Sequence, residues 1–357
     1  MIKIKLLIVI FLSLIVSSCN NQKNENKIKL INSRNKLEDS TLNTFNTQNF
    51  SPYSKIDNQI SQVVRTIFQD SKGTFWFGTE NGAFKLIDNA LIHIDKIISE
   101  SGKGVTIKKI TESTDGKIWF GHTDGISSID GNTVKNYYES DGLISNDVWS
   151  IASDKNGKIW IGTIDGLCVF NGRKFEKFSL PEGKIDSTRG ISSTKMVHSI
   201  FVDSRGTLWF SSNAGLFSYT NNALTNISKR SGIKTNFVNE VLEGKNGELW
   251  ISTKLGLYNL TENKIDDITK GKIKIGKGIG SIAEDKNGKI WFVSNQHYLF
   301  TYDGNNLIEI KKSENNKRPV IFQIYKDQDN RLWCVGFGGA FRLENDKFIN
   351  ITENGPW

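Results

Sequence analysis

Short apolar runs recur along the chain at regular intervals, separated by segments rich in Gly, Asp and Asn. Seven of these runs contain a tryptophan, and the tryptophans stand 41–49 residues apart. Nine residues before each one lies an Ile or Val within a second apolar run. Continuous β-branched runs of this length are typical of strands buried on both faces. The tryptophans are Trp76, Trp119, Trp160, Trp209, Trp250, Trp291 and Trp333.

A repeat of about 40–45 residues built from short strands is typical of a β-propeller. We therefore predict an all-β fold, a seven-bladed β-propeller of four-stranded antiparallel blades. The tryptophan side chains are expected to pack between neighbouring sheets. The apolar area that each one buries there should stabilise the fold by about a few kcal/mol. Lys347–Ile351 is the predicted outer strand of the last blade, and residues 44–50 are an alternative or additional strand there.

The turns of each repeat have fixed positions relative to its tryptophan. An Asp six residues before it and a Gly three residues before it predict a tight hairpin between the first two strands. These segments also resemble the start of a calcium loop, but the closing Glu is missing, which favours the hairpin. A Gly six residues after the tryptophan predicts the turn between strands two and three. The exceptions are Ser113 and Gly244 at the first position, Asn330 at the second and His297 at the third.

The phrase D-x-x-G-x-[LI]-W-[FI]-G-T-x-x-G-[LAI], with G-L-I-S-N-D-V at 142–148, resembles the two-component regulator propeller repeat. In that family, such propellers form the extracytoplasmic sensor region of hybrid two-component regulators and often recognise saccharides. The resemblance implies a non-catalytic binding protein of this kind. Unlike the family arrangement, the sequence predicts one propeller and no immunoglobulin-like module, membrane span or kinase, so a direct signalling role is not expected.

The N-terminus predicts export and lipid attachment. Lys3 and Lys5 precede a short apolar run, and V-S-S-C at 16–19 resembles the lipobox of bacterial lipoproteins. We expect a signal peptide at 1–18, a flexible tether at 19–50 and the propeller at 51–357. Lipid on Cys19 would anchor the protein at the membrane, and the absence of Asp after Cys19 favours the periplasmic face of the outer membrane.

Composition excludes several other classes. The formal net charge is +8, but no basic run or recognition helix is present, so no nucleic acid partner is expected. Cys168 and Cys334 fall in different blades at apolar positions, and we expect buried free thiols rather than a disulfide or a zinc site. No cofactor or metal is predicted.

The position eleven residues before each tryptophan varies, whereas the one before it is always Val or Ile. A structural position repeats its residue, so the variable one is a candidate ligand site on the face where the loops vary. Aromatic rings with directed donors suit a saccharide or a carboxylate. The alternative is that these residues merely line a wet channel. They are Arg65, Lys108, Trp149, His198, Asn239, Gly280 and Phe322.

The turn between strands two and three adds His122, Lys254 and His297 to this candidate ligand-binding set. Counting neighbouring positions, five bases and one acid are predicted at the mouth, which favours an anionic ligand. The bases are Arg65, Lys108, Lys109, Lys195 and Lys277, and the acid is Glu240. The long connection at 180–195 is a candidate lid or a neutral insertion.

Two other functions remain open from the sequence. G-x-[LI]-W-F phrases also resemble streptogramin lyases, seven-bladed propeller enzymes in which a His/Glu/metal cluster supports elimination. His122, His198 and His297 fall on blades two, four and six, so no convergent catalytic constellation is predicted. A lipid-anchored ring could also be a scaffold that docks a membrane-associated protein. No catalytic residue is assigned.

Overall fold

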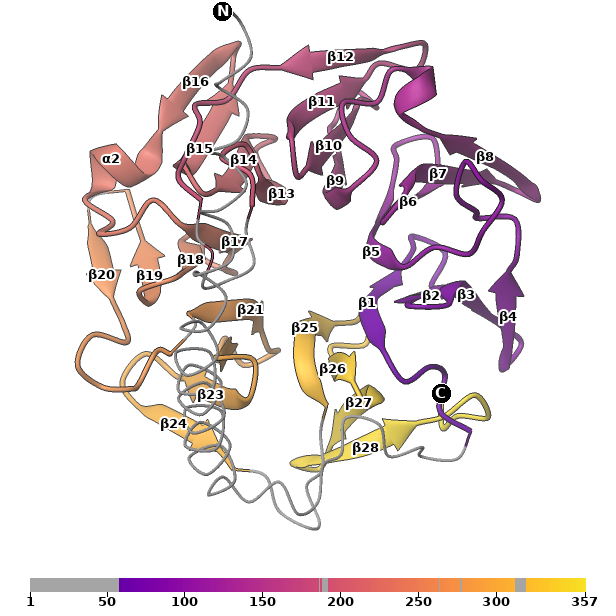
Figure 1. Ribbon diagram of the computed structural model, residues 1–357. Helices are drawn as coiled ribbons and strands as arrows, with labels where there is room; N and C mark the ends of the chain where they lie inside the picture. Colours follow the sequence, from indigo (N-terminus) through magenta and orange to yellow (C-terminus); the bar gives the residue numbers. More distant parts are fainter. Residues whose placement is uncertain (1–57, 186, 188–191, 263, 277, 312–318) are drawn as a thin grey trace, which may run out of the picture. The chain divides into compact units, whose positions relative to one another are not determined.

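The computed structural model describes residues 58–185, 187, 192–262, 264–276, 278–311 and 319–357. These residues form seven sheets of four antiparallel strands, arranged as consecutive blades of a ring (Figure 1). The predicted all-β, seven-bladed propeller is therefore confirmed. The signal peptide, Cys19 and the tether predicted at 1–50 lie outside the described residues, as does the alternative closing strand at 44–50.

Each blade runs from the centre of the ring outwards in chain order. The innermost strands are β1 (Val64–Gln69), β5 (Ile107–Glu112), β9 (Val148–Ser153), β13 (Val197–Val202), β17 (Val238–Glu243), β21 (Ile279–Glu284) and β25 (Val320–Lys326). The second strands are β2 (Phe75–Thr79), β6 (Ile118–His122), β10 (Ile159–Thr163), β14 (Leu208–Ser212), β18 (Leu249–Thr253), β22 (Ile290–Ser294) and β26 (Leu332–Phe337).

The two outer strands of each blade complete the sheets. The third strands are β3 (Gly82–Ile87), β7 (Gly125–Asp130), β11 (Gly166–Phe170), β15 (Gly215–Thr220), β19 (Leu257–Leu260), β23 (Tyr298–Tyr302) and β27 (Gly339–Glu344). The outermost are β4 (Ala90–Ile94), β8 (Thr133–Tyr137), β12 (Phe175–Phe178), β16 (Ala223–Asn226), β20 (Ile265–Asp267), β24 (Leu307–Ile310) and β28 (Lys347–Ile351). Two short helices, η1 (Glu139–Asp141) and α2 (Ile227–Ser231), lie in connections between blades.

The repeated tryptophans pack between neighbouring blades, as predicted. All seven are between 1 and 7% exposed. Trp76 of blade one, for example, packs with Ile107 and Phe120 of blade two. Each blade thus covers the apolar face of the next one, which a single sheet could not bury alone.

The repeated Asp has a second role that the sequence reading missed. Its Oδ1 accepts backbone N–H groups of the hairpin, as at Asp70 with the amides of Lys72 and Thr74. Its Oδ2 accepts the indole N–H of the tryptophan in blades one, three, four, six and seven, at 2.8–3.1 Å. One buried carboxylate therefore fixes both the turn and the tryptophan, and we call this arrangement the Trp–Asp pair.

The two blades without this Asp satisfy the indole in another way. In blade two the Trp119 indole donates to Ser113 Oγ at 3.2 Å. In blade five, where Gly244 has no side chain, the Trp250 indole donates to Glu248 Oε1 at 3.2 Å. The need for a buried acceptor thus persists where the repeat sequence changes.

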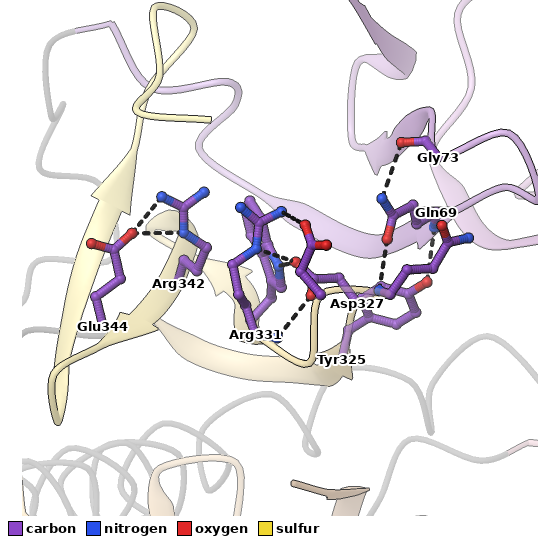
Figure 2. A network of polar contacts seen from close by, with 10 residues as sticks. Gln69, Gly73, Tyr325, Asp327, Arg331, Arg342 and Glu344 are labelled. Carbon is purple, nitrogen blue, oxygen red and sulfur yellow. Dashed lines mark hydrogen bonds and ion pairs between the residues drawn. The ribbon is translucent and has the colours of Figure 1, made fainter. Parts of the chain in front are cut away.

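Blade seven meets the start of blade one through backbone and side-chain contacts, such as the bond from the Gly338 N–H to the Gln62 carbonyl at 2.8 Å. β28 pairs with β27, so the last blade is completed by the predicted strand Lys347–Ile351. Across the junction, the backbone N–H of Gln69 donates to the Tyr325 hydroxyl at 2.9 Å. Figure 2 shows this contact beside the ion pairs of Arg331 with Asp327 and of Arg342 with Glu344.

Candidate functional site

A β-bulge interrupts every innermost strand at the same place. The pairing register between the first and second strand shifts at the residue eleven positions before the tryptophan. At blade one, Val64 pairs with Thr79 and Thr66 pairs with Gly78, which leaves Arg65 without a partner residue. A bulge re-aims the side chains around it. The variable position of the sequence is therefore the extra residue of seven bulges.

The seven bulges surround one axial cavity of about 630 Å³. Its wall contains the bulge residue and the residue after it from every blade, so each blade contributes two neighbouring positions. A cavity of this size suits a small molecule of one or two rings. The residues after the bulges are Thr66, Lys109, Ser150, Ser199, Glu240, Ser281 and Gln323.

Seven of the ten candidate residues line this cavity together: Arg65, Lys108, Trp149, His198, Asn239, Gly280 and Phe322. The structure thus brings together side chains that are up to 257 residues apart in the sequence. His122, Lys254 and His297 are not part of the cavity wall.

His122 is the fully buried last residue of β6. Its Nδ1 accepts the backbone N–H of Asp124, and its Nε2 lies 3.0 Å from Ser127 Oγ. Thr79 makes the equivalent turn contact in blade one, where its hydroxyl accepts the backbone N–H of Asn81. Burial, with a smaller contribution from the charge on Lys108, lowers the pKa of His122 to about 3. His122 is thus a neutral structural residue that replaces a threonine.

Lys254 and His297 belong to turns outside the cavity. The backbone N–H of Lys254 donates to the Phe237 carbonyl, which ties its turn to the start of β17. In blade six, where His297 replaces the usual glycine, Asn295 and Gln296 take the positive φ values of 51° and 63°. The departure at His297 therefore reflects a different turn geometry, and the wall residues there are Asn295 and Gln296.

Arg65 carries an available guanidinium group inside the cavity. Its Nε is buried without a hydrogen-bond partner, and no described residue forms an ion pair with it. The guanidinium carbon lies 5.0 Å from the ring centre of Phe322 on the neighbouring blade. Burial lowers the pKa of Arg65, and the negative charge of Glu80 partly opposes this. A buried donor without a partner is costly, so this group is suited to accept an anionic ligand.

Lys108 is held by its neighbours on blade three. Its ammonium forms an ion pair with Asp147 and lies 3.9 Å from the ring centre of Trp149. The Trp149 indole donates to the other oxygen of Asp147 at 3.1 Å. Burial lowers the pKa of Lys108, the contacts with Asp147 oppose the shift, and the charge of Arg65 adds to it. The charges of Arg65 and Lys108 therefore repel each other, and of these two cations Lys108 is the one that forms an ion pair with an acid.

The rest of the wall divides into aromatic and hydrogen-bonding residues. The His198 ring lies 4.5 Å from the Phe237 ring, and Phe322 lies 4.8 Å from Phe337. Asn239 donates to the carbonyl of Ile279 on the next blade. Aromatic faces beside directed polar groups suit a ligand that has both apolar faces and polar edges.

Several wall residues also join adjacent blades. The amide oxygen of Gln323 accepts the backbone N–H of Ile67 on blade one at 2.8 Å. Glu240 and Ser281 make the same kind of bond to the following blade, at 3.2 and 3.1 Å. Ser150 occupies the equivalent position in blade three, and its buried Oγ has no partner among the described residues.

The positive charge predicted at the mouth is smaller than the sequence suggested. Lys195 pairs with Glu182 and is not part of the wall, and Lys277 lies outside the described residues. Arg65, Lys108 and Lys109 remain, against Glu240 in the wall. Asp147 and Glu80 act on two of these bases as well. Three bases thus face three acids in and around the wall, and Arg65 and Lys109 form no ion pair with a described residue.

Among the wall residues that the sequence did not predict are Met196, Phe237, Gly278 and Ile164. The first three occupy one position, two residues before the bulge, that also holds Asp147 in blade three. Variation at this position, like that at the bulge, was the signal that could have revealed them.

The candidate lid at 180–195 is described only in part. The Asn213 amide donates to the carbonyls of Lys184 and Ser193, at 3.1 and 2.7 Å. The buried Asn213 therefore holds the two ends of this connection together. Cys168 and Cys334 are buried free thiols, as predicted, and burial raises the pKa of Cys168 to about 11. Within the described ranges, no cluster of three or more His, Cys, Asp or Glu side chains could hold a metal.

The fold and the cavity define a seven-bladed propeller with an axial site. A family model described as "Two component regulator propeller" matches residues 58–81, 142–165 and 190–214. The chain therefore carries repeats of the two-component regulator propeller family, as the sequence predicted. Comparison with curated proteins gives no match. In the described part of the chain, no helix has the length and apolar character needed to cross a membrane.

Solved structures with the same fold come from both sensors and enzymes. The extracellular domain of the putative hybrid two component system BT3049 from B. thetaiotaomicron is 23% identical, with a TM-score of 0.64 over 84% of this chain and 40% of that one. The corresponding domain of BT4673 is 21% identical, with a TM-score of 0.62 over 81% and 38%. Virginiamycin B lyase from Staphylococcus aureus is 16% identical, with a TM-score of 0.62 over 79% and 95%. The chain spans about two fifths of the length of the two sensor domains.

Proposed function

We propose that this chain is a non-catalytic, extracytoplasmic binding protein of the sensor-propeller type. Its axial cavity binds a small ligand that carries a carboxylate, such as an acidic saccharide. The carboxylate accepts hydrogen bonds from Arg65, and a ring of the ligand contacts Trp149 or Phe322.

The main support is the convergence of seven bulge residues on one cavity. The Arg65 guanidinium has a buried Nε and no ion pair among the described residues, and it lies next to the Phe322 ring. The Trp149 ring of the same wall lies next to Lys108. Arg binds carboxylates through two parallel N–H donors, which a lysine cannot reproduce. The balanced charge of the remaining wall favours a ligand with one negative charge over a highly charged one.

The sensor assignment rests on the repeat family, since the similarity to the solved domains establishes the fold alone. We also propose that Cys19 carries lipid and holds the protein at the periplasmic face of the outer membrane. Metabolic labelling with palmitate, followed by membrane fractionation, tests this. Cys19→Ala should lose the label and release the protein from the membrane, and an unchanged label would exclude the anchor.

Calorimetric titration tests the ligand class. Glucuronate and galacturonate, as monomers and short oligomers, should bind, whereas glucose and galactose should bind at least tenfold more weakly because Arg65 would lack its anion. Mass spectra of the recovered ligands should be unchanged. A modified ligand would favour a lyase instead, and equal binding of neutral sugars would overturn the carboxylate assignment.

The matched variants are Arg65→Gln and Arg173→Gln. Arg173 is an exposed arginine of a strand connection far from the cavity wall, so it controls for the loss of one positive charge. Arg65→Gln should weaken uronate binding roughly tenfold or more. If both variants weakened binding equally, the effect would be general electrostatics and not a site at Arg65.

A further inference from the structure

Charged residues are segregated on one face of the propeller. This face, here called the turn face, bears the connections from each outermost strand to the next innermost strand, together with the second-to-third-strand turns. Gly278, Asn295 and Gln296 of these segments line the cavity, so the cavity opens towards this face. The two connections on either side of blade five are purely basic.

The connection before blade five, 227–237, and the connection after it, 268–278, contain seven basic residues and no Asp or Glu. Five of these bases are lysines with described, exposed side chains, and we call them the basic crescent. They are Lys229, Lys234, Lys270, Lys272 and Lys274.

The connections hold these lysines outwards. In 268–278 the isoleucines Ile268, Ile273 and Ile275 pack against the core between blades five and six, and the intervening lysines face solvent. The turn is further held by Ser294 Oγ, which donates to the carbonyls of Lys274 and Ile275. No lysine of the crescent has an ion pair with a residue that the structure describes. Their charge is therefore not neutralised within the propeller.

The corresponding connections across the ring are neutral (95–106) or acidic (138–147) rather than basic. Segments 95–106 and 138–147, before blades two and three, contain five acids and two lysines. On the face opposite the turn face, the first hairpins place both signs side by side, as in D-K-N-G-K at 154–158 and again at 285–289. Basic and acidic residues are therefore separated on the turn face, whereas they alternate on the opposite face.

We infer that the basic crescent is a docking surface for a linear anionic polysaccharide, carboxylated or sulfated. Lysine ammonium groups are compact, strongly hydrated charges, which suit diffuse contacts with a polyanion. A protein partner would need an apolar centre to its interface, and the one exposed large apolar residue near the crescent is Leu255. A flat anionic membrane that covered the turn face would meet the acidic connection before blade three as well as the lysines.

This surface is separate from the axial cavity. None of the five lysines is part of the cavity wall, and Arg65 and Lys108 lie on blades one and two. Polyanion binding at the crescent therefore does not depend on the ligand proposed for the cavity. The two sites can be tested with different probes and different variants.

The test measures binding of the full-length protein to fluorescein-labelled dextran sulfate by anisotropy, over a series of NaCl concentrations. The triple variant Lys270→Gln, Lys272→Gln, Lys274→Gln should weaken binding roughly tenfold to a hundredfold. It should also reduce the slope of log K against log salt concentration by about two, because three fewer counterion-releasing contacts remain. Polygalacturonate should compete with the labelled probe.

The matched control removes three exposed lysines from the opposite face: Lys72→Gln, Lys158→Gln, Lys286→Gln. It has the same net charge as the test variant and should bind like the unchanged protein. Equal losses in the two variants, or no loss in either, would overturn the docking surface. Tighter crescent-dependent binding to polyglutamate, or to phosphatidylglycerol vesicles over neutral ones, would replace the polysaccharide with an acidic protein or a membrane.

Discussion

The buried tryptophan with its indole acceptor and the axial bulge occur in the same hairpin of every blade, but they respond to sequence change in opposite ways. The pair is buried between blades, and where its Asp is missing, Ser113 or Glu248 replaces the lost acceptor. The bulge residue faces the cavity, and Arg65, Trp149 and Gly280 are all accommodated there. A buried donor must be satisfied, whereas a residue that faces a polar cavity has no such constraint.

The comparison teaches where stability and recognition are located in this propeller. Each tryptophan combines apolar burial with one hydrogen bond, so the pairs stabilise the ring. The bulges add side chains to the axis without disturbing the apolar interfaces between blades. Variants at the two positions should therefore separate folding from binding.

The largest effect is expected from Trp209→Ala. Trp209 is 6% exposed and packs with Val238 and Ile251 of blade five, so its truncation leaves a large cavity between two blades. The free energy of unfolding should fall by about 3–5 kcal/mol, measured by urea denaturation. Trp149→Ala is the control, because Trp149 is 36% exposed. Equal losses in the two variants would contradict the distinction between the two positions.

Asp203→Ala should have the next largest effect. It removes the acceptor of the Trp209 indole and of the Arg205 and Thr207 backbone N–H groups. Loss of the indole bond alone should lower the free energy of unfolding by roughly 1–3 kcal/mol. The exposed turn residue Asp303 provides a control, since Asp303→Ala removes a similar turn contact without an indole. A larger loss at Asp303 would show that turn formation, not the indole, dominates.

Acid should weaken the Trp–Asp pair of Trp209 and Asp203. Burial raises the pKa of Asp203, but the bonds from the Trp209 indole and the Thr207 amide outweigh it, so the pKa lies below its ordinary value of 3.8. The stability that Asp203 contributes is then complete above that value and is lost as the pH falls through the lower folded-state pKa. Thermal unfolding of the unchanged protein and of Asp203→Ala should therefore converge below about pH 4.

The double variant Arg65→Ala, His198→Ala should change binding rather than stability. Both side chains are half-buried residues of the cavity wall. The free energy of unfolding should change by less than about 1 kcal/mol. Uronate binding, measured by calorimetry, should be lost or strongly weakened. Normal binding by this variant would exclude the axial cavity as the ligand site.

The smallest effect is expected from His297→Ala and Lys254→Ala. Both residues were predicted from the sequence as ligand contacts, and the structure places them in turns outside the cavity wall. The two variant proteins should bind uronate with the same affinity as the unchanged protein, within the error of calorimetry. A loss at either residue would extend the binding site from the cavity to the turns.

The repeat spacing was sufficient to predict the blades, because each strand and turn depends on residues a few positions apart. The hairpins at Asp70 and Asp203 and the outer strand at Lys347–Ile351 were predicted in this way and are confirmed. The second role of Asp was missed, since a carboxylate that caps a turn and one that also accepts an indole have the same sequence. The sequence offered one signal: in the two repeats that lack the Asp, at Ser113 and Gly244, another side chain nearby can accept the indole N–H.

The candidate site was predicted by position and only partly by residue. Variation at the bulge position correctly selected Arg65, Lys108 and Trp149 as neighbours in space. At His122, the same reasoning identified a change of residue but not its buried location. The ion pair of Lys108 with Asp147 was also missed, because charge counted along a sequence does not show which charges are neighbours.

The sequence by itself determined the number of blades, the order of their strands and the positions that vary, because these follow from local periodicity repeated seven times. Only the tertiary structure decided which varying side chains share a cavity, which charges neutralise one another and where unpaired lysines gather. Those properties depend on distances between blades that are remote in the chain, and ring closure alone sets those distances.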